Sequence, residues 1–569
     1  MTDTSDGSSN NSSSHNAHGG THAVNAALAY GVETMFTLSG AHVFPLYDAA
    51  VGGKALVDAG TPGPMRLVDV RHEQTAVFAA EATAKLTRTP GLAVVTAGPG
   101  VTNAVSGITT AHFNGSPVLV IGGRSPDYRW GSGALQELDQ PPILAPITKS
   151  AETVHDTAQI GAAVSRALGT AVSAHRGPTF LDVPMDILFS YADVPPVPRE
   201  PVIINEPDPD AVAKVATLIS AAQHPVVVLG SDVWTGGAED HARTFIETSG
   251  IPAIANGMGR GILSSNHPQL VTRARSAAFG QADLVIVVGT PLDFRLGYGV
   301  FGGKDGATPA KVVHIVDAVN QLSASVAPEA VIVADLDRSL EALTRAIEAL
   351  PHKPDLDQWI QGLVATAAKA AAKDRDDLTS QADPIHPARI YGDLIARLAD
   401  DAVVIGDGGD FVSFAGKYIE PNSPGGWLDP GPYGCLGTGL GYAMAARIAR
   451  PSSQVVLMLG DGAAGFSLID IDSLVRQNLP VVMIVGNNGM WGLEKHPMQF
   501  LYQYDVAADL APGTRYDDVA IALGGGGETV TSPHEIGPAL DRAFSSGIPY
   551  LVNIITDPTV AYPRSTTGI

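Results

Sequence analysis

The sequence has one cysteine, few charged residues and no long hydrophobic run. Its only cysteine, Cys435, excludes a disulfide framework and favours a reducing, cytoplasmic setting. No apolar run approaches the length that crosses a bilayer, so a membrane role is not expected. Only 35 lysines and arginines stand against 58 aspartates and glutamates, which gives a net charge of -23. This acidity argues against binding to nucleic acid or to an anionic membrane surface.

Glycine and aliphatic residues are abundant instead. The chain holds 62 glycines and is 45% hydrophobic over 569 residues, a composition typical of large cores joined by many strand–helix turns. Short apolar runs alternate with helical stretches in three blocks, which predicts an α/β protein of three doubly wound parallel-sheet domains. The expected division is a disordered tail over 1–20, domains over 21–190, 200–350 and 380–555, and a terminal tail over 556–569.

The most informative motif is a pair of polar side chains. Asp461 and Asn488 follow two neighbouring apolar runs, 455–459 and 481–485. A helical stretch between the runs makes a βαβ unit, so both side chains fall at the carboxyl ends of adjacent strands, where open α/β sheets bind ligands. One carboxylate and one amide oxygen suit an octahedral Mg²⁺ that also holds a diphosphate. A second Gly-Asp-Gly, at Asp407, is too far from Asn488 to share that unit and is interpreted as a turn.

The Gly-Asp-Gly at 460–462 followed by Asn487-Asn488 resembles the signature of enzymes that bind thiamin diphosphate (ThDP). The stretch 71–123, which contains Glu73 and Gly98-Pro99-Gly100, resembles their pyrimidine-binding domain. The resemblance implies pyrimidine-binding, middle and diphosphate-binding domains in that order. It also implies that Glu73 hydrogen-bonds the cofactor's aminopyrimidine from a neighbouring subunit. The chain is therefore expected to be a homodimer or homotetramer with active sites between subunits.

The same resemblance implies a set of cofactor ligands. The Mg²⁺ ligands are expected to be Asp461, Asn488 and the backbone carbonyl of Met490. Leu436, in the turn 434–437, is expected to lie under the cofactor and force its bent shape, with plain core packing as the alternative. Further cofactor contacts are expected from Gly409, Asp410, Phe411, Gly462, Ala463, Ala464, Trp491 and Gly492. In relatives the middle domain binds ADP or FAD.

Several segments resemble one branch of this superfamily, the 2-hydroxyacyl-CoA lyases that are similar to acetolactate synthases. Tyr442 stands where acetolactate synthases usually carry proline, and Leu135 stands where they carry phenylalanine and where oxalyl-CoA decarboxylases carry tyrosine. The other matching segments are 293–299, 407–411 and 427–431. The resemblance implies cleavage of a short 2-hydroxyacyl-CoA, such as 2-hydroxyisobutyryl-CoA, to formyl-CoA and a ketone or aldehyde. An acetolactate-synthase-like carboligase and an oxalyl-CoA decarboxylase are the alternatives.

Glu494 is the side chain that bears most on the substrate. It follows the metal segment and matches a glutamate that faces the reacting carbon in pyruvate decarboxylases. A carboxylate there would repel an oxalyl group, suits a neutral hydroxyacyl group and can move a proton. The alternative is a surface glutamate paired with Lys495. Weaker candidates for the substrate pocket are His112, Asn114, Leu135 and Gln136.

The nucleotide end of coenzyme A needs basic groups despite the acidic total. Candidates in the middle block are Arg260, Arg275 and Arg295, and Arg564 lies near the end of the chain. A surface salt bridge is the alternative for each arginine. The terminal segment is expected either to fold over the substrate as a lid or to fray.

Overall fold

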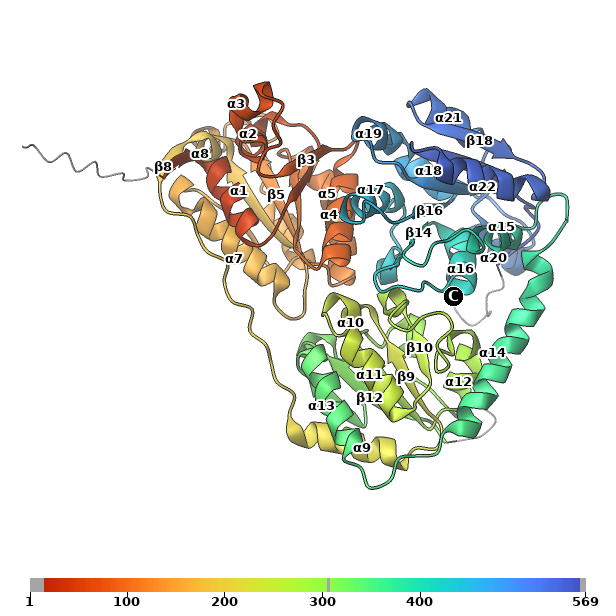
Figure 1. The fold of residues 1–569 in the computed structure, drawn as a ribbon. Coiled ribbons are helices and arrows are strands. Elements are labelled where there is room, and N and C mark those ends of the chain that lie inside the picture. The colour runs from red at the N-terminus through yellow and green to blue at the C-terminus, as the bar shows by residue number, and fades with distance from the viewer. Residues whose placement is uncertain (1–14, 304–307, 563–569) are drawn as a thin grey trace, which may run out of the picture.

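A computed structural model describes residues 15–303 and 308–562. Three α/β domains follow one another along the chain and lie around a common centre, coloured red to orange, yellow to green, and blue (Figure 1). An extended connector, 194–208, leads into the central domain, and a long helix, α14 (Asp357–Leu378), leads out of it. Each domain is built on a parallel sheet, which confirms the predicted fold class. Within the described ranges no helix is long and apolar enough to cross a membrane.

The first domain has a six-stranded sheet in the order β3-β2-β4-β5-β7-β6, with every pair parallel. The strands are β2 (Thr34–Thr37), β3 (Arg66–Asp69), β4 (Gly91–Val95), β5 (Val118–Arg124), β6 (Ala151–Thr153) and β7 (Thr179–Pro184). The helices are α1 (Gly19–Ala29), α2 (Phe44–Val51), α3 (Gly53–Asp58), α4 (Glu73–Thr87), α5 (Pro99–Phe113), α6 (Pro141–Leu144), α7 (Ile160–Val172) and α8 (Met185–Phe189). β4 and β5 are buried at every residue, as expected for parallel strands covered on both faces.

The third domain repeats this topology, in the order β15-β14-β16-β17-β19-β18. Its strands are β14 (Val403–Asp407), β15 (Trp427–Leu428), β16 (Val455–Gly460), β17 (Val482–Asn487), β18 (Gly526–Val530) and β19 (Tyr550–Ile555). Its helices are α15 (Pro387–Ile395), α16 (Gly409–Tyr418), α17 (Gly439–Ala449), α18 (Asp461–Ser467), α19 (Ile471–Arg476), α20 (Gly492–Tyr502), α21 (Tyr516–Ala522) and α22 (Ile536–Ser545). The next two strands along the chain, β15 and β16, pair with β14 on its two opposite sides. Parallel α/β sheets bind ligands at such a switch point in strand order.

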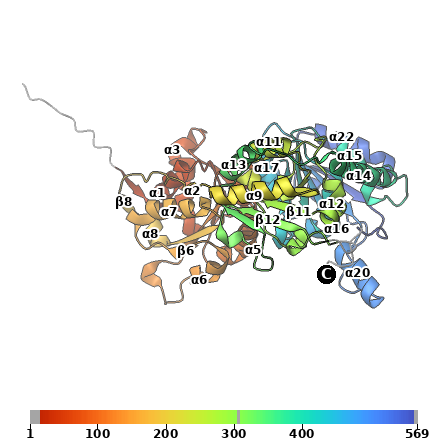
Figure 2. The same ribbon diagram turned by 90° about the horizontal axis from the view of Figure 1, so that it is seen from below.

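The central domain has a five-stranded parallel sheet in the order β10-β9-β11-β12-β13. Its strands are β9 (Pro225–Leu229), β10 (Ala253–Ala255), β11 (Leu284–Val288), β12 (Lys311–Val316) and β13 (Ala330–Val333). Its helices are α9 (Pro209–Ala221), α10 (Ser231–Thr235), α11 (Glu239–Ser249), α12 (Arg275–Gln281) and α13 (Leu336–Glu348). From below, this domain lies in front of the other two, with α9 nearest the viewer (Figure 2).

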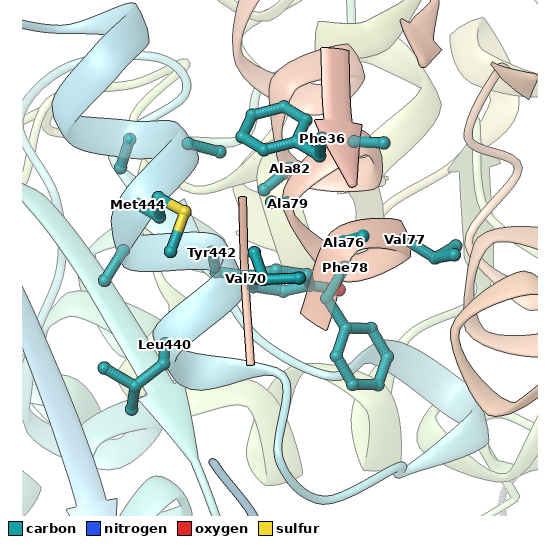
Figure 3. Close-up of a cluster of buried hydrophobic side chains, with 14 of the residues drawn as sticks. Phe36, Val70, Ala76, Val77, Phe78, Ala79, Ala82, Leu440, Tyr442 and Met444 are labelled. Carbon is teal, nitrogen blue, oxygen red and sulfur yellow. The ribbon is translucent and has the colours of Figure 1, made fainter. Parts of the chain in front are cut away.

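The first and third domains share one hydrophobic core, because α4 packs directly on α17 (Figure 3). The rings of Phe78 and Tyr442 meet edge to face with their centroids 6.3 Å apart. Gly441 permits this approach, since a Cβ there would lie 2.9 Å from the Cβ of Phe78. The two domains that carry the predicted cofactor residues are therefore held together as one packed unit.

The prediction of a disordered tail over 1–20 is wrong for its last residues. β1 (Asn16–His18) pairs antiparallel with β8 (Tyr191–Asp193), and α1 begins at Gly19. This pairing gives the backbone of the segment hydrogen-bond partners that its polar composition did not reveal. Residues 1–14 and 563–569 lie outside the described residues, and Tyr562 packs edge to face on Phe414 with ring centroids 5.0 Å apart.

Candidate active site

Asp461 and the Asn488 segment meet at the carboxyl end of the third domain's sheet. Asp461 begins α18 directly after β16, and Asn488 directly follows the neighbouring strand β17. The carboxylate of Asp461 accepts hydrogen bonds from the backbone N–H groups of Gly489 at 2.7 Å and Gly462 at 2.9 Å. Burial raises the pKa of Asp461 to about 6, a cost that an adjacent divalent cation would offset. Both predicted metal ligands thus lie on one edge of the sheet.

The two adjacent asparagines make different contacts. Asn487 is buried, and its Nδ2 donates a hydrogen bond to Oδ1 of Asn553 at 3.1 Å, which fixes the end of β17. Asn488 Nδ2 donates to Oδ2 of Asp410 at 3.3 Å, and its Oδ1 accepts from the backbone N–H of Met490 at 3.2 Å. Asn488 therefore turns its oxygen toward the segment that the sequence assigns to the metal.

Glycines allow the chain to pack closely around these side chains. Gly408 has a φ of 97°, and a Cβ there would lie 2.6 Å from the Cβ of Ala463. At Gly492 a Cβ would lie 2.5 Å from Oδ2 of Asp410. The first turns of α16 and α18 begin at the same edge of the sheet, and the backbone N–H groups of a helix start can bind an anion.

Asp407 is not the plain turn residue that the sequence suggested. It is fully buried at the end of β14, and its Oδ2 accepts hydrogen bonds from the backbone N–H groups of Gly439 at 2.8 Å and Gly437 at 3.1 Å. Burial raises its pKa to about 7. Asp407 therefore anchors the turn that carries the half-buried Leu436. Its place at the switch point of the sheet was the sign that could have revealed this role.

Glu73 is the first residue of α4 and is only 6% exposed. Its Oε2 accepts a hydrogen bond from Nδ2 of Asn103 at 3.0 Å, within the same domain. The glycine loop beside it is held by Gln140, whose Oε1 accepts from the backbone N–H of Gly98 at 2.8 Å. Gln140 lies in no motif, so sequence reasoning missed it. The first domain thus presents a positioned, shielded carboxylate.

Glu494 lies in the first turn of α20, which projects from the body of the protein (Figure 2). Its side chain is exposed, and within the described ranges no hydrogen bond or ion pair involves its carboxylate. Lys495, the partner considered from the sequence, instead pairs with Asp505 at 3.6 Å and with Asp509. The structure therefore does not show the alternative considered from the sequence, a surface ion pair between Glu494 and Lys495.

The four predicted substrate-pocket residues fall into different settings. His112 is exposed near the end of α5, Leu135 is 77% exposed, and Gln136 adopts a left-handed φ of 60° in a surface loop. Asn114 is already engaged, because its Nδ2 donates a hydrogen bond to Oε1 of Glu81 at 2.7 Å at the junction of the first and third domains. Asn114 is thus placed as a structural residue of that junction.

The predicted nucleotide-binding arginines cluster in the central domain and contact protein groups. Arg260 donates to the backbone carbonyl of Gly416 at 2.8 Å, in the third domain. Arg275 donates to the carbonyl of Arg295, and the Arg295 guanidinium pairs with Asp293 at 2.6 Å. Burial, together with the charges of Arg260 and Arg295, lowers the pKa of Arg275 to about 10. Arg564 lies outside the described residues.

The family models of the thiamine pyrophosphate (ThDP) enzymes match all three domains in order. The N-terminal ThDP-binding domain matches 18–143, the central domain 212–343 and the C-terminal ThDP-binding domain 407–554. The chain belongs to the thiamine pyrophosphate enzyme family. Its first and third domains are thus ThDP-binding domains, and the strand-end residues of the third lie inside the matched range.

Relatives named for two different activities are similar to this ThDP enzyme over nearly its whole length. Acetolactate synthase large subunit IlvG of Mycobacterium tuberculosis is 46% identical over 96% of this chain and 97% of its own. 2-hydroxyacyl-CoA lyase 2 of Homo sapiens is 32% identical over 95% of this chain and 90% of its own. The protein of the same name from Caenorhabditis elegans is 32% identical over 90% and 84%.

Proposed function

We propose that this ThDP enzyme cleaves and forms the carbon–carbon bond of short 2-hydroxyacyl-CoA thioesters, with formyl-CoA and a ketone or aldehyde as the cleavage products. The exposed carboxylate of Glu494, which pairs with no group in the described ranges, carries this proposal, since it directly follows the metal segment. Bound ThDP supplies the electron sink for the carbon that cleavage leaves behind. The protein then has to position the substrate, move protons and exclude competing substrates.

Mg²⁺ is the cation that the donor set of the third domain fits. Asp461 and Asn488 offer a carboxylate and an amide oxygen, and the backbone carbonyl of Met490 is the proposed third protein ligand. Hard oxygen donors with room for water and phosphate oxygens are the usual Mg²⁺ environment. The first turns of α16 and α18, which begin at the same edge, support a diphosphate there.

Glu73 is proposed to hold a proton on the pyrimidine ring of the cofactor. Its shielding and its hydrogen bond from Asn103 support this role. We further propose that Glu73 acts on the cofactor of a second copy, in a homodimer or homotetramer. Exposed apolar side chains near both sites support a second copy, since Leu135 is 77% and Phe500 70% exposed in the single chain.

Glu494 is proposed to transfer the protons near the thioester carbon. Cleavage converts the 2-hydroxyl group into a carbonyl as the C1–C2 bond breaks, and the proton lost from oxygen is balanced by one gained at C1. A carboxylate at this point can deliver that proton. It would repel the carboxylate of an oxalyl group, so a neutral hydroxyacyl group is the better fit.

The arginine cluster of the central domain is proposed to meet the phosphates of coenzyme A, or of ADP or FAD. Arg275 lies half-buried beside two like charges, Arg260 and Arg295, and an anion would offset that repulsion. This local positive charge exists despite the acidic chain as a whole. The proposal predicts nucleotide binding in the central domain, away from the ThDP edge.

Acetolactate synthesis is the second candidate, favoured by the 46% identity to relatives that carry that name. The ThDP- and Mg²⁺-loaded enzyme should be incubated separately with 2-hydroxyisobutyryl-CoA, oxalyl-CoA and pyruvate. Formyl-CoA with acetone from the first substrate is the expected result. Acetolactate from pyruvate with no formyl-CoA from the first substrate would replace the lyase by the synthase, and formyl-CoA from oxalyl-CoA alone would indicate a decarboxylase.

A further inference from the structure

A cluster of one half-buried histidine and two buried aspartates lies where the first domain meets the central domain. His175 follows α7, Asp232 lies in α10, and Asp317 follows β12. Nδ1 of His175 is 2.9 Å from Oδ1 of Asp317 and 3.9 Å from Oδ2 of Asp232. The three ligand atoms lie within 4.8 Å of one another, and the side chains are 11% exposed or less. No role in the ThDP chemistry accounts for this cluster.

The carboxylate of Asp232 is the unexplained member. The residue is 8% exposed, and within the described ranges its carboxylate makes no hydrogen bond. Among the residues that the structure describes, its one ion-pair partner is Nδ1 of His175, which lies too far away for a hydrogen bond and already contacts Asp317. One ring nitrogen cannot serve both carboxylates. A buried carboxylate without a hydrogen bond is costly, and a cation bound between the three side chains would offset that cost.

We propose that His175, Asp232 and Asp317 bind a divalent transition-metal ion, of which Zn²⁺ is the best fit, between the first and central domains. One imidazole nitrogen and two carboxylate oxygens form a mixed donor set typical of Zn²⁺. Bonds of about 2.0–2.2 Å place tetrahedral ligands roughly 3.2–3.6 Å apart, so the observed spacings need only small adjustments. A water molecule would complete four ligands.

The surroundings hold this site in shape. Nη1 of Arg176 lies 3.8 Å from Oδ2 of Asp317 and helps to orient that carboxylate. Nζ of Lys149 donates to the backbone carbonyls of His175 at 2.7 Å and Ser173 at 2.8 Å, which fixes the loop of the first domain. Such outer contacts orient metal ligands. Because the ligands come from two domains, the bound ion would tie those domains together and stabilise their junction.

The test measures zinc in the ThDP- and Mg²⁺-loaded full chain after dialysis against Zn²⁺ and gel filtration. Wild type is expected to hold one more Zn²⁺ per chain than Asp232→Asn, and its thermal midpoint is expected to rise with Zn²⁺ while that of the variant does not. Asp232→Asn should fold, since within the described part of the chain the carboxylate makes no hydrogen bond that the amide would lose; circular dichroism and ThDP binding verify this.

A matched control separates a built site from stray binding. His241 and Asp337 form an exposed pair in the same domain, with Nδ1 and Oδ1 2.6 Å apart and side chains 38% and 32% exposed. Asp337→Asn should therefore keep the full zinc content and the zinc-dependent midpoint. Histidines near the N-terminus contribute equally to every variant. Equal zinc in wild type and Asp232→Asn, or no zinc in either, would overturn the proposal and leave a salt-bridge cluster only.

Discussion

The hydroxyl of Tyr442 in α17 donates a hydrogen bond to Oε2 of Glu81 in α4, 2.7 Å away. Both side chains are fully buried at the contact between the first and third domains. The other oxygen of Glu81 meets Nζ of Lys85 at 2.9 Å and Nδ2 of Asn114 at 2.7 Å. One buried carboxylate thus fixes how the two ThDP-binding domains pack, and the hydroxyl of Tyr442 is the donor from the third domain.

Tyr442→Phe removes that donor and leaves Glu81 short of one hydrogen bond. We expect a loss of about 1–3 kcal/mol in the free energy of unfolding, because a buried charged acceptor loses a partner. Denaturant midpoints of the two proteins measure this. Tyr550→Phe is the control, since that hydroxyl donates at 2.9 Å to Glu528, which Arg542 still pairs with. An equal loss in both variants would contradict a special role for Tyr442.

Asp461→Asn should weaken the Mg²⁺-dependent binding of ThDP by on the order of tenfold or more, because a neutral amide replaces the metal-binding carboxylate. Calorimetric titration with ThDP at a fixed Mg²⁺ concentration measures the change in affinity. Asp472→Asn is the control, because that carboxylate pairs with Arg476 at 2.8 Å on the surface helix α19. ThDP affinity that stays the same in Asp461→Asn would remove Asp461 from the metal site.

Glu494→Gln should keep ThDP binding and lower turnover by about 10²- to 10⁴-fold, the usual contribution of a positioned proton donor. Steady-state assays on the preferred substrate measure turnover, and calorimetry measures cofactor affinity. Glu348→Gln, at an exposed glutamate near the end of α13, should change neither. Unchanged turnover in Glu494→Gln would exclude that carboxylate from the chemistry.

The stability of the cofactor-free protein should depend on pH through the side chain of Asp407. Its pKa is raised by burial from 3.8 to about 7, so the folded state binds the proton more tightly than the unfolded state. The stability contributed by this proton is full below pH 3.8 and is lost as the pH rises toward 7, by at most about 1.4 kcal/mol per pH unit. Denaturant midpoints between pH 4 and 8 measure this.

Asp407→Asn should remove that loss, so the variant's stability relative to wild type should improve as the pH rises. The amide oxygen can still accept from Gly437 and Gly439, because one oxygen of Asp407 already accepts from both. Asp400→Asn, at an exposed aspartate just before β14, should follow the wild-type curve. Parallel curves for wild type and Asp407→Asn would contradict the assigned proton.

Strands with continuous apolar runs were predictable from the sequence. β9 and β11 are fully buried, and their own apolar residues are enough to predict a strand. The βαβ spacing likewise predicted that Asp461 and Asn488 lie on one edge of a sheet. β18 reads Gly-Gly-Glu-Thr-Val and has no such run; it is a strand because it pairs with β19. Short strands of this kind depend on neighbours that the local sequence does not contain.

The sequence by itself determined the three-domain order, the ThDP motifs and the candidate metal ligands, because these depend on residues close together along the chain. The tertiary structure alone decided that Asp407 anchors the turn at Leu436, that Tyr442 meets Glu81, and that His175 meets Asp317. Those partners lie about 30 to 360 residues apart in the sequence. Burial and hydrogen bonding between such distant residues arise only once the sheets are formed and the domains are packed.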